Sequence, residues 1–212
     1  MGQCKQPSAI VYIDGFNLYY GALKARPYLR WLDLEALGER LIPADHDLLA
    51  VKYFTAAVPE TDSNPLAAKR QAIYWKALRS TPKVQLELGH VAIRRRSARL
   101  ADGSGFVSIL HREEKGSDVN LASALLIDHF LRTPDLAIVI SDDTDLESPV
   151  AMVRERGQHL QIISPRGMQL ERLGCPEHRA RKLRQSVLVT SQFPDRVVAH
   201  DGTTLVRPES WT

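Results

Sequence analysis

Short apolar runs alternate along this chain with longer segments in which apolar residues recur at helical spacing. The run at residues 9–13 is rich in β-branched side chains and has the length of a buried strand. The run at residues 136–140 is the most apolar of all. Apolar runs of similar character predict the remaining strands at residues 47–58, 84–93 and 160–164.

Segments with helical periodicity separate these strands. The spacing predicts helices at residues 16–23, 34–42, 66–80, 117–131 and 144–156. Asp33 is expected to cap the second of these helices, and Pro43 is expected to end it. Because strands and helices alternate, the pattern predicts an α/β fold with a mostly parallel sheet and helices on both of its faces.

A hairpin interrupts this alternation after the strand at 84–93. The turn sequence at 102–105 and the apolar run at 106–110 predict its turn and its return strand. The predicted basic tip carries four arginines, Arg94, Arg95, Arg96 and Arg99. Charged hairpin tips are often only solvated, so this cluster by itself does not establish a binding surface.

The character of the chain changes again after residue 165, where arginines crowd the sequence. A short strand is predicted at 187–189, and residues 185–212 form a tail that either docks on the domain or is partly mobile. We therefore expect one domain over residues 8–165, followed by a basic C-terminal extension and tail over residues 166–212.

Composition narrows the function only slightly. The 212 residues are 44% hydrophobic and 25% charged, as in ordinary globular proteins, and the net charge of +3 permits an anionic partner without demanding one. Cys4 and Cys175 form no CxxC pair, and the histidines show no HxH or HExxH spacing, so zinc chemistry is not predicted. Reduced thiols are the simpler interpretation, and a disulfide between the two stays open. The sequence shows neither a signal peptide nor an apolar run long enough to span a membrane, so we expect a cytoplasmic protein.

Acidic residues stand at equivalent places in three segments. Asp14 ends the first strand, Asp118 opens the helix at 117–131, and Asp142, Asp143 and Asp145 follow the strand at 136–140. Because the carboxyl ends of parallel strands meet at one edge of a sheet, Asp14 and Asp143 are expected to lie close together. Gathered carboxylates repel one another, and a hard cation such as Mg²⁺ or Mn²⁺ relieves that conflict and activates water. Phosphodiester hydrolysis is the reaction that such a site serves best.

Each acid also has a purely structural interpretation. Asp14 would cap the helix that follows it. Ser117 or Asp118 would likewise be an N-cap, and Thr144 with Glu147 forms a capping-box pattern. The joint placement of acids in three separate segments is what favours a site over three independent caps.

Three motifs carry a family resemblance: YIDGFNLYYG near the start, KGSDVNLA in the middle and ISDDTDL before a helix. Because these motifs occur in this order, the chain resembles the NYN domain, a PIN-like nuclease fold found in LabA-like bacterial proteins. The resemblance covers about residues 8–165, and the late QFPD, RP and W residues resemble the tail of LabA-like members. It implies a Rossmann-like, PIN-type α/β domain with an acidic metal site and ribonuclease activity. Carried over position by position, it marks five residues, Asp14, Asn17, Asp118, Asp143 and Asp145.

The sequence departs from the family pattern at two positions. Members often carry an acid in an LAxD pattern where this chain has Ala124, and the nearest later acid, Asp128, lies one helical turn on, about 6 Å along the axis. Asp128 is expected to be too far from a metal, or solvated. Asp142 stands where members often have Gly or Asn and is ranked below Asp143.

These observations together predict a metal-dependent endoribonuclease. Mg²⁺ or Mn²⁺ would be held by Asp14, Asp118, Asp143 and Asp145, while Asn17 would orient Asp14 or a phosphate. The RNA, single-stranded or structured, would meet five basic residues, Arg94, Arg95, Arg96, Arg99 and Lys115. A homo-oligomer stays open. Two alternative functions stay open. The first is an RNA-binding regulator with little or no catalysis, which Ala124 favours. The second is a phosphatase-like metal hydrolase, although the sequence lacks the Gly-rich loop that binds phosphate in many such enzymes.

Overall fold

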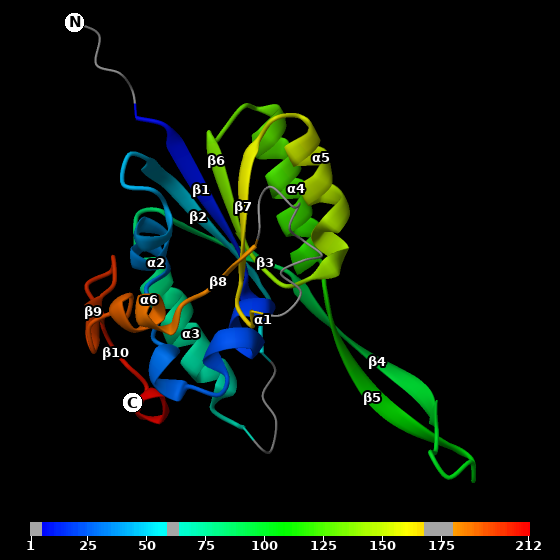
Figure 1. Ribbon diagram of the computed structural model, residues 1–212. Helices are drawn as coiled ribbons and strands as arrows, with labels where there is room; N and C mark the ends of the chain where they lie inside the picture. The colour runs from blue at the N-terminus through cyan, green and yellow to red at the C-terminus, as the bar shows by residue number, and fades with distance from the viewer. Residues whose placement is uncertain (1–5, 59–63, 168–179) are drawn as a thin grey trace, which may run out of the picture.

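A parallel β-sheet forms the centre of the computed structural model, which describes residues 6–58, 64–167 and 180–212. Among these residues the sheet has six strands in the order β3-β2-β1-β6-β7-β8, and every neighbouring pair runs parallel. The strands are β1 (Ser8–Asp14), β2 (Asp47–Thr55), β3 (Val84–Leu88), β6 (Leu136–Ile140), β7 (His159–Ser164) and β8 (Arg181–Lys182). The predicted α/β fold with a mostly parallel sheet is confirmed (Figure 1).

Helices cover both faces of this sheet (Figure 1). On one face lie α4 (Ser117–Phe130) and α5 (Glu147–Glu155), and on the other lie α2 (Leu34–Leu41), α3 (Ala67–Leu78) and α6 (Gln185–Thr190). The alternation of β1 serves both faces, because Val11 and Ile13 belong to the core on the α2 side, and Ile10 and Tyr12 to the core on the α4 side. Two hydrophobic cores therefore hold the central strand in place.

Short helical segments connect the main elements. They are α1 (Gly15–Leu18), the π-helical η1 (Tyr19–Leu23), and the 3₁₀ segments η2 (Pro27–Leu29), η3 (Thr144–Leu146) and η4 (Glu209–Trp211). Asp33 caps α2 as predicted, accepting hydrogen bonds from the backbone N–H groups of Glu35 and Ala36. None of the helices described here combines the length and apolar character needed to cross a bilayer.

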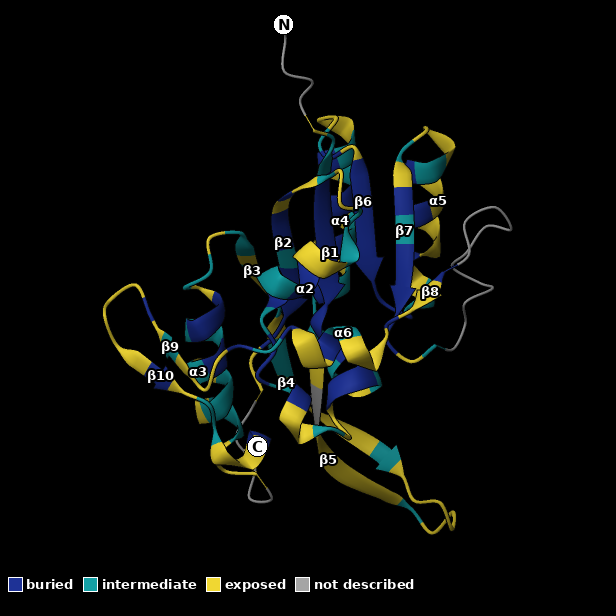
Figure 2. Ribbon diagram, turned by 60° about the vertical axis from the view of Figure 1, so that its left-hand side comes forward, coloured by how far each residue is buried: buried dark blue, intermediate teal, exposed yellow. Residues whose placement is uncertain are grey.

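The strand predicted at 84–93 is in fact two strands. β3 stays in the sheet, whereas β4 (His90–Arg99) leaves it and pairs in antiparallel fashion with β5 (Phe106–Lys115). Gly89 permits the break, because an added Cβ would lie 2.5 Å from a Glu114 carboxylate oxygen and 2.9 Å from the Lys115 carbonyl. We call residues 90–115 the hairpin arm; it projects away from the sheet and is largely exposed (Figures 1 and 2).

The C-terminal residues pack onto the domain, which is the docked alternative expected for them. The strand predicted at 187–189 is wrong, because these residues lie in α6. A small hairpin of β9 (Arg196–Val198) and β10 (Thr204–Val206) follows. Trp211 is buried, with its ring centroid 6.2 Å from that of Trp31 and 5.9 Å from that of Tyr74. An aromatic cluster thus joins the end of the chain to the core.

Candidate metal centre

The acidic site begins where strand β1 ends. Asp14 is the last residue of β1 and is only 2% exposed. Its carboxylate caps α1 by accepting a hydrogen bond of 2.9 Å from the Asn17 backbone N–H. Gly15 allows the turn to pack closely, because an added Cβ would lie 2.7 Å from the Phe54 carbonyl oxygen. The capping role considered for Asp14 is therefore present, and it coexists with a position at the carboxyl edge of the sheet.

The second acid follows the neighbouring strand, β6. Asp143 lies three residues beyond the end of β6, which pairs in parallel with β1. Its carboxylate accepts a hydrogen bond of 3.0 Å from the Asp145 backbone N–H and so caps η3. The cap predicted at Thr144 is thus one residue off.

The third acid enters from the helix that packs across the sheet. Asp118 is the second residue of α4, whose N-cap is Gly116 at a φ of 99° with no side-chain hydrogen bond. The N-cap considered for Ser117 or Asp118 is therefore wrong. Because the Asp118 carboxylate does not cap its own helix, it is left to face the sheet edge.

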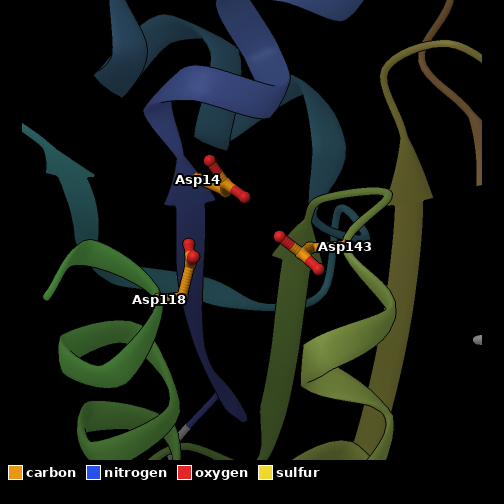
Figure 3. A group of neighbouring side chains, drawn as sticks. All are labelled: Asp14, Asp118 and Asp143. Carbon is orange, nitrogen blue, oxygen red and sulfur yellow. The ribbon is translucent and has the colours of Figure 1, made fainter. Parts of the chain in front are cut away.

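The three carboxylates converge on one point (Figure 3). Asp14, Asp118 and Asp143 each offer an oxygen, and these oxygens lie within 4.8 Å of one another. The structure therefore brings together three of the four acids predicted to bind metal. We call these three residues the acidic centre.

Burial and repulsion from neighbouring acids raise the pKa of two carboxyl groups of the acidic centre, those of Asp14 and Asp118. Burial raises the pKa of Asp14, and the charge of Asp143 adds to it, while hydrogen bonds from Asn17 and Ser141 oppose the rise. Burial, followed by the charges of the surrounding acids, raises the pKa of Asp118 to about 6. A bound cation would remove this conflict, because it favours the ionised form of every ligand.

The donor set suits a hard divalent cation. The acidic centre offers carboxylate oxygens and no sulfur or imidazole ligand among the described residues that compose it. Mg²⁺ and Mn²⁺ prefer such oxygens, and Mg²⁺ keeps several waters when only a few carboxylates bind it. The residues present therefore fit either ion.

A hydrogen-bond network fixes the orientation of Asp14. The Asn17 side-chain amide donates to Asp14 Oδ2 at 2.6 Å, and the buried Ser141 hydroxyl donates to the same oxygen at 2.9 Å. The Ser141 hydroxyl in turn accepts a hydrogen bond of 3.0 Å from the Asp143 backbone N–H. Two of the three acids are therefore tied to one serine, an arrangement that orients metal ligands.

Two acids close to the acidic centre have other positions. Asp145 is exposed and lies outside the group of three, although its charge adds to the raised pKa of Asp118. Asp142 is buried and accepts a hydrogen bond of 3.0 Å from the Arg166 backbone N–H. Asp142 thus holds the loop after β7. Its carboxylate does not belong to the group of three that includes Asp143.

Asp128 is neither solvated nor near the acidic centre. It accepts a hydrogen bond of 2.7 Å from the Tyr12 hydroxyl and forms an ion pair of 2.6 Å with the Lys52 ammonium group. The expectation of a solvated carboxylate is wrong, because α4 packs this face against the sheet. The three residues form a brace between α4, β1 and β2, with Ala124 one turn earlier packed against the apolar core.

The basic residues predicted to bind RNA lie on the hairpin arm. Lys115 ends β5 at the base of the arm, 3.4 Å from a Glu113 carboxylate oxygen and three residues before Asp118. The arginines lie within strand β4 instead of at the hairpin tip, and all four are exposed. Within the described part of the chain, none of the four forms an ion pair.

Two residues close to the acidic centre escape prediction from the sequence. Ser141 precedes the acids directly, but nothing in the sequence indicates that its hydroxyl reaches Asp14. Glu114 accepts a hydrogen bond of 3.0 Å from the Ser117 backbone N–H, and its charge adds to the pKa rise of Asp118. The only sequence signal for Glu114 is its position four residues before Asp118.

Comparison with known proteins gives a family match and a similar enzyme. The model of the NYN domain matches residues 8–174. The chain is also similar to the 6-hydroxy-3-succinoylpyridine 3-monooxygenase HspA of Pseudomonas putida (strain DSM 28022 / S16), with 28% identity over 95% of this chain and 74% of that protein.

Among solved structures, the chain is similar to a protein of unknown function from Vibrio parahaemolyticus. The identity is 15%, the TM-score is 0.46, and the match covers 91% of this chain and 93% of the other.

Proposed function

The chain belongs to the NYN domain family, and from this premise we propose that it is a metal-dependent endoribonuclease that hydrolyses phosphodiester bonds of RNA. The observation that carries the proposal is the convergence of Asp14, Asp118 and Asp143, whose carboxylate oxygens lie within 4.8 Å of one another. A site of this kind suits phosphodiester hydrolysis, since no side-chain nucleophile is required.

In this proposal Asp14, Asp118 and Asp143 hold Mg²⁺ or Mn²⁺, and Asp145 supports the site from its exposed position. The ion would supply positive charge against the phosphate and would activate the attacking water. Asn17 and Ser141 keep the Asp14 carboxylate in one orientation through bonds of 2.6 and 2.9 Å. Their contribution is positioning, because both act through Asp14.

The RNA would also contact the hairpin arm. Arg94, Arg95, Arg96 and Arg99 are exposed and have no carboxylate partner among the described residues, which leaves their guanidinium groups available to phosphates. Lys115 would add a charge at the base of the arm, three residues before Asp118 in the sequence.

The alternative is an RNA-binding regulator of the same fold with weak or absent catalysis. Ala124 favours it, because α4 then contributes Asp118 alone where family members often contribute a second acid. This alternative predicts RNA binding that survives removal of metal, without cleavage.

A second candidate comes from the similar enzyme, whose name describes monooxygenation of 6-hydroxy-3-succinoylpyridine. The similarity over 95% of this chain favours testing it. Purified protein would be incubated with that compound, a reduced nicotinamide and O₂, and product would be sought by mass spectrometry. Turnover to a hydroxylated product would favour this candidate, and its absence alongside RNA cleavage would favour the nuclease.

The nuclease proposal is tested by cleavage of end-labelled single-stranded RNA. Parent protein and Asp143→Asn would be compared with Mn²⁺ and with EDTA. We expect cleavage only by the parent with Mn²⁺. Cleavage indifferent to both EDTA and Asp143 would contradict the proposal, and metal-independent binding without cleavage would favour the regulator.

A further inference from the structure

A cavity of about 860 Å³ opens on the face of the sheet that α2 and α6 cover. Its walls come from η1, α2, the loop after β7, strand β8 and the start of α6. Six of the described residues that line it are cationic: Arg26, Arg40, Arg166, Arg181, Lys182 and Arg184. No aspartate or glutamate is among the described lining residues. We call this feature the basic cavity.

The cations of the basic cavity have no ion-pair partner within the described part of the chain, although the charge of Arg40 acts on Asp33 and opposes the rise that burial causes in the pKa of that residue. By contrast, Lys52, Lys76 and Lys83 form ion pairs elsewhere. Arg26 and Arg40 donate to backbone carbonyls at 3.3 and 2.9 Å, which are neutral partners. Like charges gathered around one hollow repel one another, and an anionic ligand would relieve that repulsion.

The basic cavity is connected to the loop that carries Asp142 and Asp143. The Arg166 backbone N–H donates to Asp142, the residue directly before Asp143. Gly21 allows η1 to pack against the same loop, because an added Cβ would lie 2.7 Å from Pro165 Cβ. One wall of the cavity is therefore tied to the loop that carries Asp143.

We propose that the basic cavity binds the phosphate backbone of the single-stranded RNA that enters the acidic centre. This inference rests on the proposed nuclease function and names a substrate contact beyond the hairpin arm. A ligand with repeated negative charge matches six cations better than a single anion does. A concave, positively charged path that follows one backbone is typical of single-strand binding.

The test removes two charges that folding does not need. Lys182 and Arg184 are exposed and form no ion pair in the described chain, so Lys182→Gln/Arg184→Gln is expected to fold normally. The matched control is Lys69→Gln/Arg79→Gln, which removes the same net charge from exposed positions on and just after α3. Binding of fluorescein-labelled oligouridylate is followed by anisotropy across a salt series, with EDTA and again with Ca²⁺ in its place.

We expect the cavity variant to bind roughly tenfold more weakly than the parent at low salt. Its plot of log affinity against log salt should be shallower by about 1.4, which is two phosphate contacts at about 0.7 each. The control variant should keep the slope of the parent. A cavity variant with the parent's slope, or a parent that binds RNA under neither condition, would overturn the proposal.

A competition experiment distinguishes the RNA backbone from a free nucleotide as the ligand of the basic cavity. Unlabelled oligouridylate, ADP and inorganic phosphate are each titrated against the labelled RNA. Displacement by ADP at concentrations equal to or below those of oligouridylate would overturn the RNA assignment. RNA cleavage with Mn²⁺ is measured in parallel. If the cavity binds RNA but the protein does not cleave it, only the proposed nuclease function is contradicted. If the cavity variant cleaves RNA as the parent does, only the proposed role of the cavity is contradicted.

Discussion

The acidic centre and the hairpin arm are built in opposite ways, although the sequence predicts that both face the same RNA. Two acids of the acidic centre, Asp14 and Asp143, follow β1 and β6, whose residues are almost entirely buried. Their carboxylates are held by hydrogen bonds from Asn17, Ser141 and Asp145. The hairpin arm carries charged and apolar side chains on two exposed strands, with Phe106 73% and Leu110 66% exposed. The comparison teaches that the geometry of the acidic centre depends on the core. The arm reaches that centre through Glu114 at its base, so we expect changes further along the arm to leave the geometry intact.

The largest effect is expected from a change at the acidic centre. Asp14→Asn removes a charged ligand while keeping the shape of the side chain. RNA cleavage with Mn²⁺ should fall by more than about 100-fold, above the loss typical for residues that only support a ligand. Glu155→Gln, which removes an exposed acid at the end of α5, is the control and should cleave as the parent does. Near-parent cleavage by Asp14→Asn would contradict the account.

The brace formed by Tyr12, Lys52 and Asp128 is expected to control stability. Asp128→Asn leaves the mostly buried Lys52 without its partner, so the free energy of unfolding in urea should drop by about 3 kcal/mol. Tyr12→Phe removes a single hydrogen bond and should cost only about 1 kcal/mol. Equal and negligible losses for the two variants would show that α4 is held by apolar packing alone.

Changes on the hairpin arm should affect binding and leave folding intact. Arg94→Gln/Arg95→Gln/Arg96→Gln removes three exposed charges, and RNA affinity at low salt should fall roughly tenfold or more. The melting temperature should match that of the parent, because no ion pair of these residues exists within the described chain. Unchanged affinity would mean that these charges serve solubility.

The smallest expected effect is a gain in stability of the metal-free protein. The pKa of Asp118 is raised to about 6, so the folded protein holds this proton more tightly than the unfolded chain does, and stability falls as pH rises through 6. Asp118→Asn should therefore melt at a higher temperature than the parent at pH 7.5 with EDTA, and the gain should vanish at pH 4. A loss of stability at pH 7.5 would contradict the repulsion inferred for the acidic centre.

The proximity of two acids of the acidic centre could be predicted because both stand where a predicted strand ends. Asp14 and Asp143 come at or just after the ends of two apolar runs, and parallel strands bring such ends to one edge. The contacts that orient them could not be predicted, because Ser141 reaches Asp14 across 127 residues of sequence. The surroundings of Asp128 could not be predicted for the same reason, since both of its partners lie on strands far away in the chain.

The departures from the predicted fold also have physical causes. The segment from Val84 to Ile93 is predicted as one strand, although its apolar alternation changes phase at Gly89. The packing of Gly89 against Glu114 and Lys115 shows why the chain leaves the sheet there. The run at 187–189 is too short to distinguish a strand from a helix, and in α6 only Leu188 is buried. The sequence indicates that basic residues crowd the chain after residue 165, but it gives no sign that Arg26 and Arg40 join four of them around one cavity.

Binding of Mn²⁺ to the acidic centre tests the central claim most directly. The parent, Asp143→Asn and the control Glu155→Gln would be titrated with Mn²⁺, the free ion followed by electron paramagnetic resonance, and RNA cleavage measured in the same samples. The account predicts that the parent and the control bind Mn²⁺ and cleave RNA in proportion to occupancy, and that Asp143→Asn loses both. Equal Mn²⁺ binding by all three proteins, or cleavage without bound Mn²⁺, would contradict it.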